Sequence, residues 1–322
     1  MKQILALIAG AILIAACGSE EAERSADGRL TVGFSQIGSE SGWRTSFTQA
    51  VQSEARNRDI TLRFSDAQQK QENQIRAVRS FIAQGVDAII IAPVVETGWR
   101  PVLTEAQRAG IPVVIIDRNM ALEDDSLYLT RVASDFVEEG RKAARWLMDE
   151  TGGDCAIVEL QGTVGASAAI DRMSGFNEVI ADYPNARIVM SQTADFTRTR
   201  GKDIMVTFLR AMNPKDICAV WAHNDEMALG AIIAMKEAGV APGRDILVVS
   251  VDAVPDIFKA MSDGDANATV ELSPHMGGPA FDAIEAHLRG ESVPKLIPVN
   301  GDLFTQETAA EEYRRRTSGE AR

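Results

Sequence analysis

Short apolar runs alternate with longer stretches of helical spacing along the chain from residue 30 onward. The runs are four to six residues long and rich in Ile and Val, which is typical of buried strands. In the first part of the chain they predict strands at residues 30–35, 60–65, 88–92 and 113–117. Apolar residues three and four positions apart predict helices at residues 43–57, 69–84 and 98–109. This alternation indicates a parallel sheet with helices on both faces.

A second series of the same kind begins near residue 136. It predicts strands at residues 155–160, 187–193, 219–223, 246–251 and 267–272. The helices that it predicts lie at residues 136–151, 166–181, 199–212, 225–238 and 255–263. A last helix at 274–290 and an extended piece at 297–303 follow, and we expect the charged tail at 308–322 to pass gradually into disorder. The pattern therefore predicts an α/β protein of two doubly wound parallel-sheet lobes.

The length of the chain agrees with two lobes. It has 322 residues, whereas a single core stops growing at about 250–300 residues. We expect residues 30–132 and 273–297 to form the N-terminal lobe, and residues 133–272 and 298–322 to form the C-terminal lobe.

The charge of the chain limits its partners. Lys and Arg total 33 against 46 Asp and Glu, which gives a formal net charge of −13. A field of this sign repels phosphate backbones and anionic lipid surfaces, so we expect no nucleic-acid partner.

The first residues have the pattern of an export signal. Lys2 precedes an unbroken apolar run at residues 4–16, which fits the hydrophobic region of a secretory signal. The small residues before Cys17 resemble the lipobox of bacterial lipoproteins. We therefore predict a signal peptide at residues 1–16, a lipid on Cys17 that anchors the protein to a bacterial membrane, and a tether at residues 17–29. The alternative is an ordinary secretory signal, with Cys17 removed or left free.

Two further cysteines, Cys155 and Cys218, each stand at the start of an apolar strand-like run. If the two strands are parallel neighbours, the thiols lie side by side at one edge of the sheet. In an exported protein this arrangement favours a disulfide. The alternative is that both cysteines are small buried apolar residues.

Polar and aromatic side chains follow the carboxyl ends of nearly all the predicted strands, where doubly wound sheets bind their ligands. Asp, Asn and Arg offer paired donors and acceptors to vicinal hydroxyls, and aromatic faces stack on the C–H patches of a sugar ring. We therefore predict a sugar site made of Glu40, Ser41, Gly42, Trp43, Arg44, Asp117, Arg118, Arg172, Phe196, Asn224 and Asp252.

Some polar and aromatic residues also have purely structural interpretations. Asp225 begins a predicted helix, and we interpret it as the N-cap. Arg172 lies on a helix, and its alternative role is that of a solvated charge. Trp99 and Trp221 occupy positions typical of core residues, so we interpret both as packing residues.

The sequence predicts no metal, no cofactor and no enzymatic activity. His223, His275 and His287 are isolated and lack the spacing of metal ligands, so we expect structural or surface roles for them. Walker A, G-x-G-x-x-G and G-x-S-x-G motifs are absent from the sequence. The enzymatic alternative is a glycoside-processing hydrolase in which Asp117 and Asp252 act as acid and base.

Three segments carry a resemblance to a known family. Residues 30–44 contain LTVGFSQ and GSESGWR, residues 68–75 read QQKQENQI, and residues 159–167 read ELQGTVGAS. Over residues 30–304 the chain resembles the periplasmic sugar-binding proteins of ABC importers, in the ribose and galactose group. The arginine beside the tryptophan, at Arg44 and Trp43, is similar to the galactofuranose-binding subgroup.

The resemblance implies a type I periplasmic binding fold, in which a hinge of three crossing strands lets the lobes close on the sugar. We expect the crossings near residues 131–134, 272–273 and 298–301. In ribose binders the last crossing carries a glutamine to the ligand. The corresponding stretch here is 268–274, and the sequence leaves open which residue from Glu271 to Ser273 faces the cleft.

The resemblance also implies a function. It describes a monomeric receptor that captures a monosaccharide, here galactofuranose, and delivers it to the permease subunits of an ABC importer. Asp117, Arg118, Arg172, Asn224 and Asp252 fall on the positions that clamp the sugar in the wider family. The alternative output is a signal, from a sugar receptor for chemotaxis or for a sensor kinase.

Overall fold

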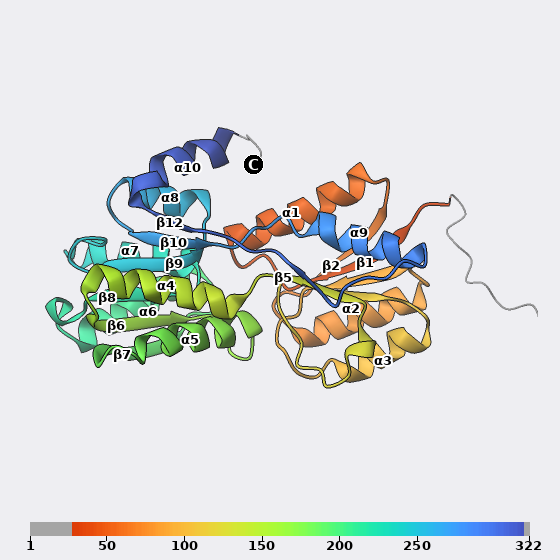
Figure 1. Ribbon diagram of the computed structural model, residues 1–322, viewed down its shortest axis with the longest axis horizontal. Coiled ribbons are helices and arrows are strands. Elements are labelled where there is room, and N and C mark those ends of the chain that lie inside the picture. The colour runs from red at the N-terminus through yellow and green to blue at the C-terminus, as the bar shows by residue number, and fades with distance from the viewer. Residues whose placement is uncertain (1–27, 319–322) are drawn as a thin grey trace, which may run out of the picture.

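Two six-stranded sheets organise residues 28–318, the part of the chain that the computed structural model describes (Figure 1). The N-terminal lobe has the strand order β11-β5-β4-β3-β1-β2, and all neighbouring strands are parallel. Its elements are β1 (Thr31–Gln36), α1 (Gly42–Asn57), β2 (Thr61–Asp66), α2 (Gln71–Ala83), β3 (Ala88–Ile91), α3 (Arg100–Arg108), β4 (Val113–Ile116), the short 3-10 helix η1 (Asp125–Leu127), β5 (Thr130–Ala133), α9 (Gly277–Leu288) and β11 (Leu296–Pro298).

The C-terminal lobe has the strand order β12-β10-β9-β8-β6-β7. Its strands are parallel except β12, which runs antiparallel to β10. Its elements are α4 (Phe136–Thr151), β6 (Asp154–Gln161), α5 (Ser167–Ile180), β7 (Asn185–Thr193), α6 (Arg198–Ala211), the 3-10 helix η2 (Pro214–Asp216), β8 (Ala219–Ala222), α7 (Asp225–Glu237), β9 (Leu247–Asp252), α8 (Pro255–Ser262), β10 (Ala268–Glu271), β12 (Leu303–Thr305) and α10 (Gln306–Ser318).

The chain passes between the two sheets three times, from β5 to α4, from β10 to α9 and from β11 to β12 (Figure 1). The two-lobed architecture and its three crossings are therefore confirmed. Strands such as β3 and β4 are short and buried at each position, as expected for a sheet covered on both faces. Trp99 and Trp221 are both buried, and Trp221 stacks on Phe176, which confirms their packing role.

The extended piece predicted at 297–303 leaves β11, carries the third crossing and enters β12, which are two short strands in different sheets. One prediction for the end of the chain is wrong. The predicted disorder of the tail is absent as far as Ser318, because these residues form α10, which packs on α8. This helix has no broad apolar stripe in its sequence, and Ala309 is its buried residue. Its attachment depends on tertiary contacts that no local pattern shows.

Cys155 and Cys218 form a disulfide, as predicted. Their strands β6 and β8 are parallel neighbours, and Cys218 N–H donates to the Ala156 carbonyl at 2.9 Å. The bond lies at the amino ends of these strands, whereas the polar residues discussed below follow their carboxyl ends.

Between residues 28 and 318, no helix combines the length and the apolar character needed to cross a membrane. The predicted signal peptide, the lipid on Cys17 and nearly all of the tether lie outside the described residues.

Candidate functional site

A cavity lies between the lobes at the carboxyl ends of the strands of both sheets. It is a small cavity whose wall combines charged, amide and aromatic side chains. Its lining residues are Glu40, Ser41, Trp43, Arg44, Asp117, Arg118, Ala168, Arg172, Phe196, Asn224, Asp252 and Leu272. The topology explains this convergence, since parallel strands end at one edge of a sheet and the two edges face each other.

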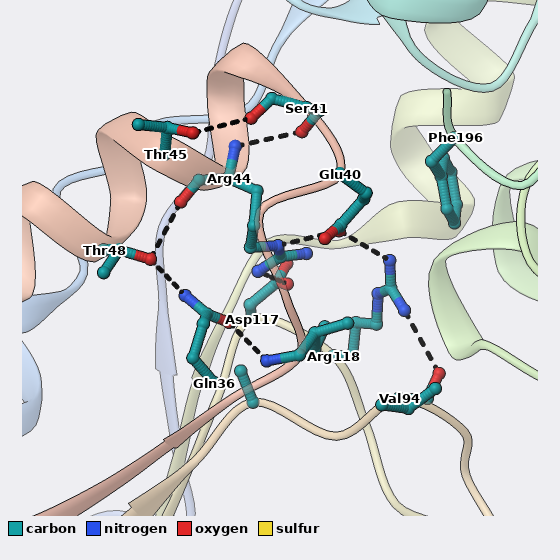
Figure 2. Close-up of polar contacts among 12 residues, drawn as sticks. Gln36, Glu40, Ser41, Arg44, Thr45, Thr48, Val94, Asp117, Arg118 and Phe196 are labelled. Carbon is teal, nitrogen blue, oxygen red and sulfur yellow. Dashed lines mark hydrogen bonds and ion pairs between the residues drawn. The ribbon is translucent and has the colours of Figure 1, made fainter. Parts of the chain in front are cut away.

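On the N-terminal side, Glu40, Arg44, Asp117 and Arg118 form an ion cluster (Figure 2). Arg44 Nε donates to Glu40 Oε1 at 3.1 Å, and Arg44 Nη1 lies 2.7 Å from Asp117 Oδ2. Arg118 Nη2 lies 4.0 Å from Glu40 Oε1, and its Nη1 donates to the Val94 carbonyl at 3.1 Å. None of these four side chains is more than 4% exposed. Buried charges are tolerated when they are paired, and here the two arginines and the two carboxylates balance one another's charge.

The pKa values of the two arginines respond differently to this burial. Burial and the neighbouring Arg44 charge lower the pKa of Arg118 to about 10. Burial also opposes the charge on Arg44, but Asp117 and Glu40 more than offset it and raise the pKa of Arg44. Both guanidinium groups are therefore charged at neutral pH and act as fixed donors.

Two aromatic rings, one from each lobe, border the cavity. The Trp43 ring stacks on Phe47 with centroids 5.2 Å apart, and the Arg44 guanidinium lies 4.8 Å from its centroid. Phe196 approaches from the other lobe, with the Arg118 guanidinium 4.9 Å from its centroid (Figure 2). Such rings supply apolar faces beside the charged groups.

The stretch between β10 and α9 reaches the cavity through Leu272. Its carbonyl accepts a 2.6 Å hydrogen bond from Trp43 Nε1, and Leu272 is among the lining residues. Glu271 instead pairs with Arg316 of α10. Of the three residues from Glu271 to Ser273, the one that faces the cleft is therefore Leu272.

On the C-terminal side, Arg172 enters the cavity from α5. Its Nε donates to Glu139 Oε2 at 2.8 Å, and its Nη1 donates to the His223 carbonyl at 2.6 Å. Its Nη2 is buried and has no hydrogen-bond partner within residues 28–318, and the same is true of Glu40 Oε2 across the cavity. Buried polar atoms are normally paired, so these two atoms point to a polar ligand. Arg172 is 2% exposed, which excludes the alternative of a solvated charge.

Asn224 both caps a helix and faces the cavity. Its Oδ1 accepts the Met227 N–H at 3.0 Å, and its Nδ2 donates to the Phe196 carbonyl at 3.2 Å. The N-cap interpretation of Asp225 is therefore wrong. Asp225 is the first helical residue, and its carboxylate accepts from Ser250 Oγ at 2.5 Å, as well as from the Val254 backbone N–H at 2.8 Å. Sequence alone misplaced the cap by one residue.

Asp252 stands at the end of β9, and burial raises its pKa well above the usual value, although Arg172 opposes the rise. Asp117, Phe196 and Asp252 have positive φ values of 66°, 60° and 124°. Non-glycine residues adopt such conformations at a cost of about 1–3 kcal/mol each, and they cluster at functional sites. The backbone is thus strained at three of the positions that face the cavity.

The two lobes make direct contact near the cavity. Gly42 N–H donates to Glu226 Oε1 at 3.2 Å, Glu96 N–H donates to the Gly165 carbonyl at 3.0 Å, and Asn119 N–H donates to Ser167 Oγ at 2.7 Å. Each hydrogen bond joins one lobe to the other. The structure is therefore a closed arrangement of the lobes.

Most of the predicted site residues meet in this one cavity. Gly42 is the exception, since it is not a lining residue and its N–H contacts Glu226 instead. Ala168 lines the cavity but was not predicted, because its side chain is neither polar nor aromatic, and Leu272 is the lining residue among the three that the sequence left open.

The histidines have the structural and surface positions expected of them. His223 is buried, its Nε2 lies 3.0 Å from Glu159 Oε1, and burial lowers its pKa. His275 and His287 are exposed. The described part of the chain contains no group of three or more His, Cys, Asp or Glu residues suited to a metal ion.

The fold and the cavity define a binding protein of two closing lobes. The chain belongs to the family described as periplasmic binding protein domain, whose model matches residues 32–292. The galactofuranose-binding protein YtfQ of Escherichia coli (strain K12) is 57% identical over 290 residues, which are 89% of this chain and 91% of that protein.

Two solved structures are also similar. The periplasmic binding protein of the arabinose ABC transporter from Shewanella sp. ANA-3, bound to α- and β-L-arabinofuranose, is 71% identical with a TM-score of 0.88, and the match covers 89% of this chain and 96% of that one. A protein from Mycobacterium smegmatis in complex with β-D-fucofuranose is 45% identical with a TM-score of 0.87, and the match covers 90% of this chain and 95% of that one.

Proposed function

We propose that this protein is an extracytoplasmic receptor that captures a furanose sugar, galactofuranose, between its lobes and delivers it to an ABC importer. The observation that carries the proposal is the closed cavity, in which Glu40 Oε2 and Arg172 Nη2 are buried without partners from opposite lobes. A ring with adjacent hydroxyls can accept from the guanidinium and donate to the carboxylate at the same time.

The ligands of the similar proteins support a sugar with a five-membered ring as the ligand of this protein. Their ligands are galactofuranose, arabinofuranose and fucofuranose, which share the furanose ring and differ in the substituent outside it. Arabinofuranose is the second candidate, because the arabinose-transporter protein is the one 71% identical to this chain.

Binding is coupled to lobe closure in this proposal. Residues 30–132 with 273–297 and residues 133–272 with 298–322 move as two lobes about the three crossings. A sugar in the cavity contacts both lobes in the closed state, and so it shifts the equilibrium toward closure by its differential contacts.

The remaining roles follow from the family and the export signal. The closed receptor docks as a monomer on the permease subunits and catalyses no reaction. A lipid on Cys17 holds it at a bacterial membrane, facing the periplasm. Mass spectrometry of the mature protein tests the anchor, since an unmodified N-terminus beyond residue 17 contradicts it.

Sugar binding is tested by titration after removal of any co-purified sugar by unfolding and refolding. We expect D-galactose, whose solution contains a furanose form, to raise the melting temperature at saturation, and ribose and glucose to leave it unchanged. A response to L-arabinose alone selects arabinofuranose instead. A response only to a pyranose contradicts the furanose assignment, and no response to any sugar contradicts the receptor function.

Two arginines of neighbouring helices provide a matched pair for this experiment. Arg172→Ala removes a buried cavity guanidinium, and we expect it to abolish the response. Arg141→Ala removes a surface guanidinium that pairs with Glu178, and we expect the response to be retained. Equal responses from both variants contradict the site.

A further inference from the structure

The C-terminal helix α10 lies on α8 at the outside of the C-terminal lobe, beyond residue 292 where the matched family domain ends (Figure 1). Ala309 is its buried residue, and Tyr313 is a partly buried apolar residue packed against the core, so apolar burial supplies part of its attachment. Near its end, a charged side chain adds contacts close to the crossings between the lobes.

That side chain is Arg316. Its Nη2 donates to Glu271 Oε1 at 2.6 Å, and its Nε donates to Glu312 Oε2 at 3.2 Å. The guanidinium lies 4.9 Å from the Phe258 ring centroid and 5.4 Å from that of Phe304. The Arg316 and Glu271 side chains are only 16% and 9% exposed. This pair is therefore more costly to break than an ordinary surface ion pair.

Glu271 occupies a junction of the hinge. It is the last residue of β10, directly before the crossing to α9, and its N–H donates to the Asp302 carbonyl in the crossing from β11 to β12 at 2.8 Å. The two crossings touch so closely that a Cβ on Gly301 would lie 2.1 Å from the Glu271 carbonyl oxygen. Lys142 of α4 donates to the Gly301 carbonyl at 2.6 Å. Side chains of the C-terminal lobe thus hold the ends of two crossings.

The residue after this junction belongs to the cavity. Leu272 accepts the hydrogen bond from Trp43 Nε1 across the lobes, and both residues line the cavity. A displacement of Glu271 therefore moves the carbonyl that receives the Trp43 indole when the lobes close.

We propose that Arg316 is a positioning residue for the sugar site: it holds Glu271 and thereby sets the Leu272 carbonyl against which Trp43 closes. This inference rests on the proposed sugar-binding function. It makes α10 part of the receptor's hinge, although no residue of α10 lines the cavity.

The test compares adjacent arginines of α10. Arg316→Ala removes the contact with Glu271, whereas Arg315→Ala removes another contact with Glu312 and leaves Glu271 paired. With the sugar identified by titration, we expect Arg316→Ala to raise Kd about tenfold, within the usual range of coupling between distant sites, mainly through faster release. Arg315→Ala should leave Kd unchanged. A lower melting temperature of sugar-free Arg316→Ala with an unchanged Kd overturns the proposal, because it shows a merely structural role.

A double-mutant cycle tests whether Arg316 acts on the site through the Leu272 carbonyl. Trp43→Phe keeps the ring and removes the N–H that Leu272 accepts, so its effect on Kd and that of Arg316→Ala should be less than additive. Additive effects overturn the route through Leu272. If Arg316→Ala does not fold, Glu271→Gln carries the same test, since it keeps the shape and removes the charge. Wild-type protein that binds no sugar refutes the proposed function itself, whereas wild-type binding with unaffected variants refutes only this inference.

Discussion

The N-terminal half of the cavity wall pairs most of its charged groups with one another, whereas the C-terminal half combines one buried ion pair with a backbone carbonyl and a helix cap. Arg44 is held between Glu40 and Asp117, all from one lobe. Arg172 of the other lobe shares its donors between Glu139 and a backbone carbonyl. Asn224 is oriented by the helix that it caps.

We call the N-terminal part of the cavity wall, with Glu40, Arg44, Asp117 and Arg118, the preformed half. We call the C-terminal part, with Arg172, Asn224 and Asp252, the responsive half. In the N-terminal half the charged groups pair with one another, so removal of one member leaves an uncompensated buried charge, and Glu40 Oε2 is left without a hydrogen-bond partner in the described structure. The C-terminal half keeps Arg172 Nη2 without a partner in the described structure and a carboxyl, Asp252, whose pKa is raised. We infer that the N-terminal half orients the sugar and that the C-terminal half supplies the hydrogen bonds that form when the lobes close.

The largest effect is expected from Asp117→Ala in the preformed half. It leaves the Arg44 charge without one of its two carboxylate partners, and breaking a buried pair costs about 3–5 kcal/mol. We expect Kd to rise about a hundred- to a thousandfold, with a lower free energy of unfolding, measured by calorimetric titration and denaturant unfolding. Asp125→Ala, an exposed aspartate of the same lobe, is the control. An affinity unchanged in Asp117→Ala removes this residue from the site.

A smaller effect is expected from Asn224→Ala in the responsive half. Loss of the cap costs about 1 kcal/mol of stability, and loss of the amide contacts raises Kd about ten- to a hundredfold. Asn224→Asp separates the two roles, because a carboxylate keeps the cap but lacks the amide N–H groups. If Asn224→Asp binds as tightly as the wild type, the amide does not donate to the sugar and the residue is only a cap.

The smallest expected effect is a pH dependence of the affinity, which arises from two carboxyl groups of opposite lobes, Glu96 and Asp171. Burial raises the pKa of both groups, and the Asp171 charge raises that of Glu96 further. The closed state therefore holds protons more tightly than an open state, and its stability rises as the pH falls and is lost as the pH rises through the raised pKa values.

We expect affinity to increase about two- to fivefold between about pH 7 and about pH 5. Glu96→Gln should weaken this dependence and tighten binding at neutral pH, whereas Glu123→Gln at an exposed position should change neither. A titration series across this pH range decides the point. If Glu96→Gln shows the same pH dependence of affinity as the wild type, repulsion between Glu96 and Asp171 does not contribute to lobe closure.

Much of the site could be predicted because parallel strands share an edge. Residues such as Asp117, Asn224 and Asp252 directly follow apolar runs, so their convergence follows once the sheet is doubly wound. Leu272 could not be predicted in the same way, because it contributes a backbone carbonyl and an apolar side chain. The cap at Asn224 rather than Asp225 depends on where the chain turns into α7, which local propensity does not resolve to one residue.

By itself, the sequence determined the alternation of strands and helices, the two lobes and the polar character of the strand ends, and it favoured the disulfide. These features depend on local periodicity and on rules that hold for any parallel sheet. The tertiary structure decided the pairing of Arg172 with Glu139, the contact of Trp43 with Leu272 and the attachment of α10 through Arg316. Such contacts join segments far apart in the chain. Their strength comes from mutual burial, which exists only after the lobes have folded and closed.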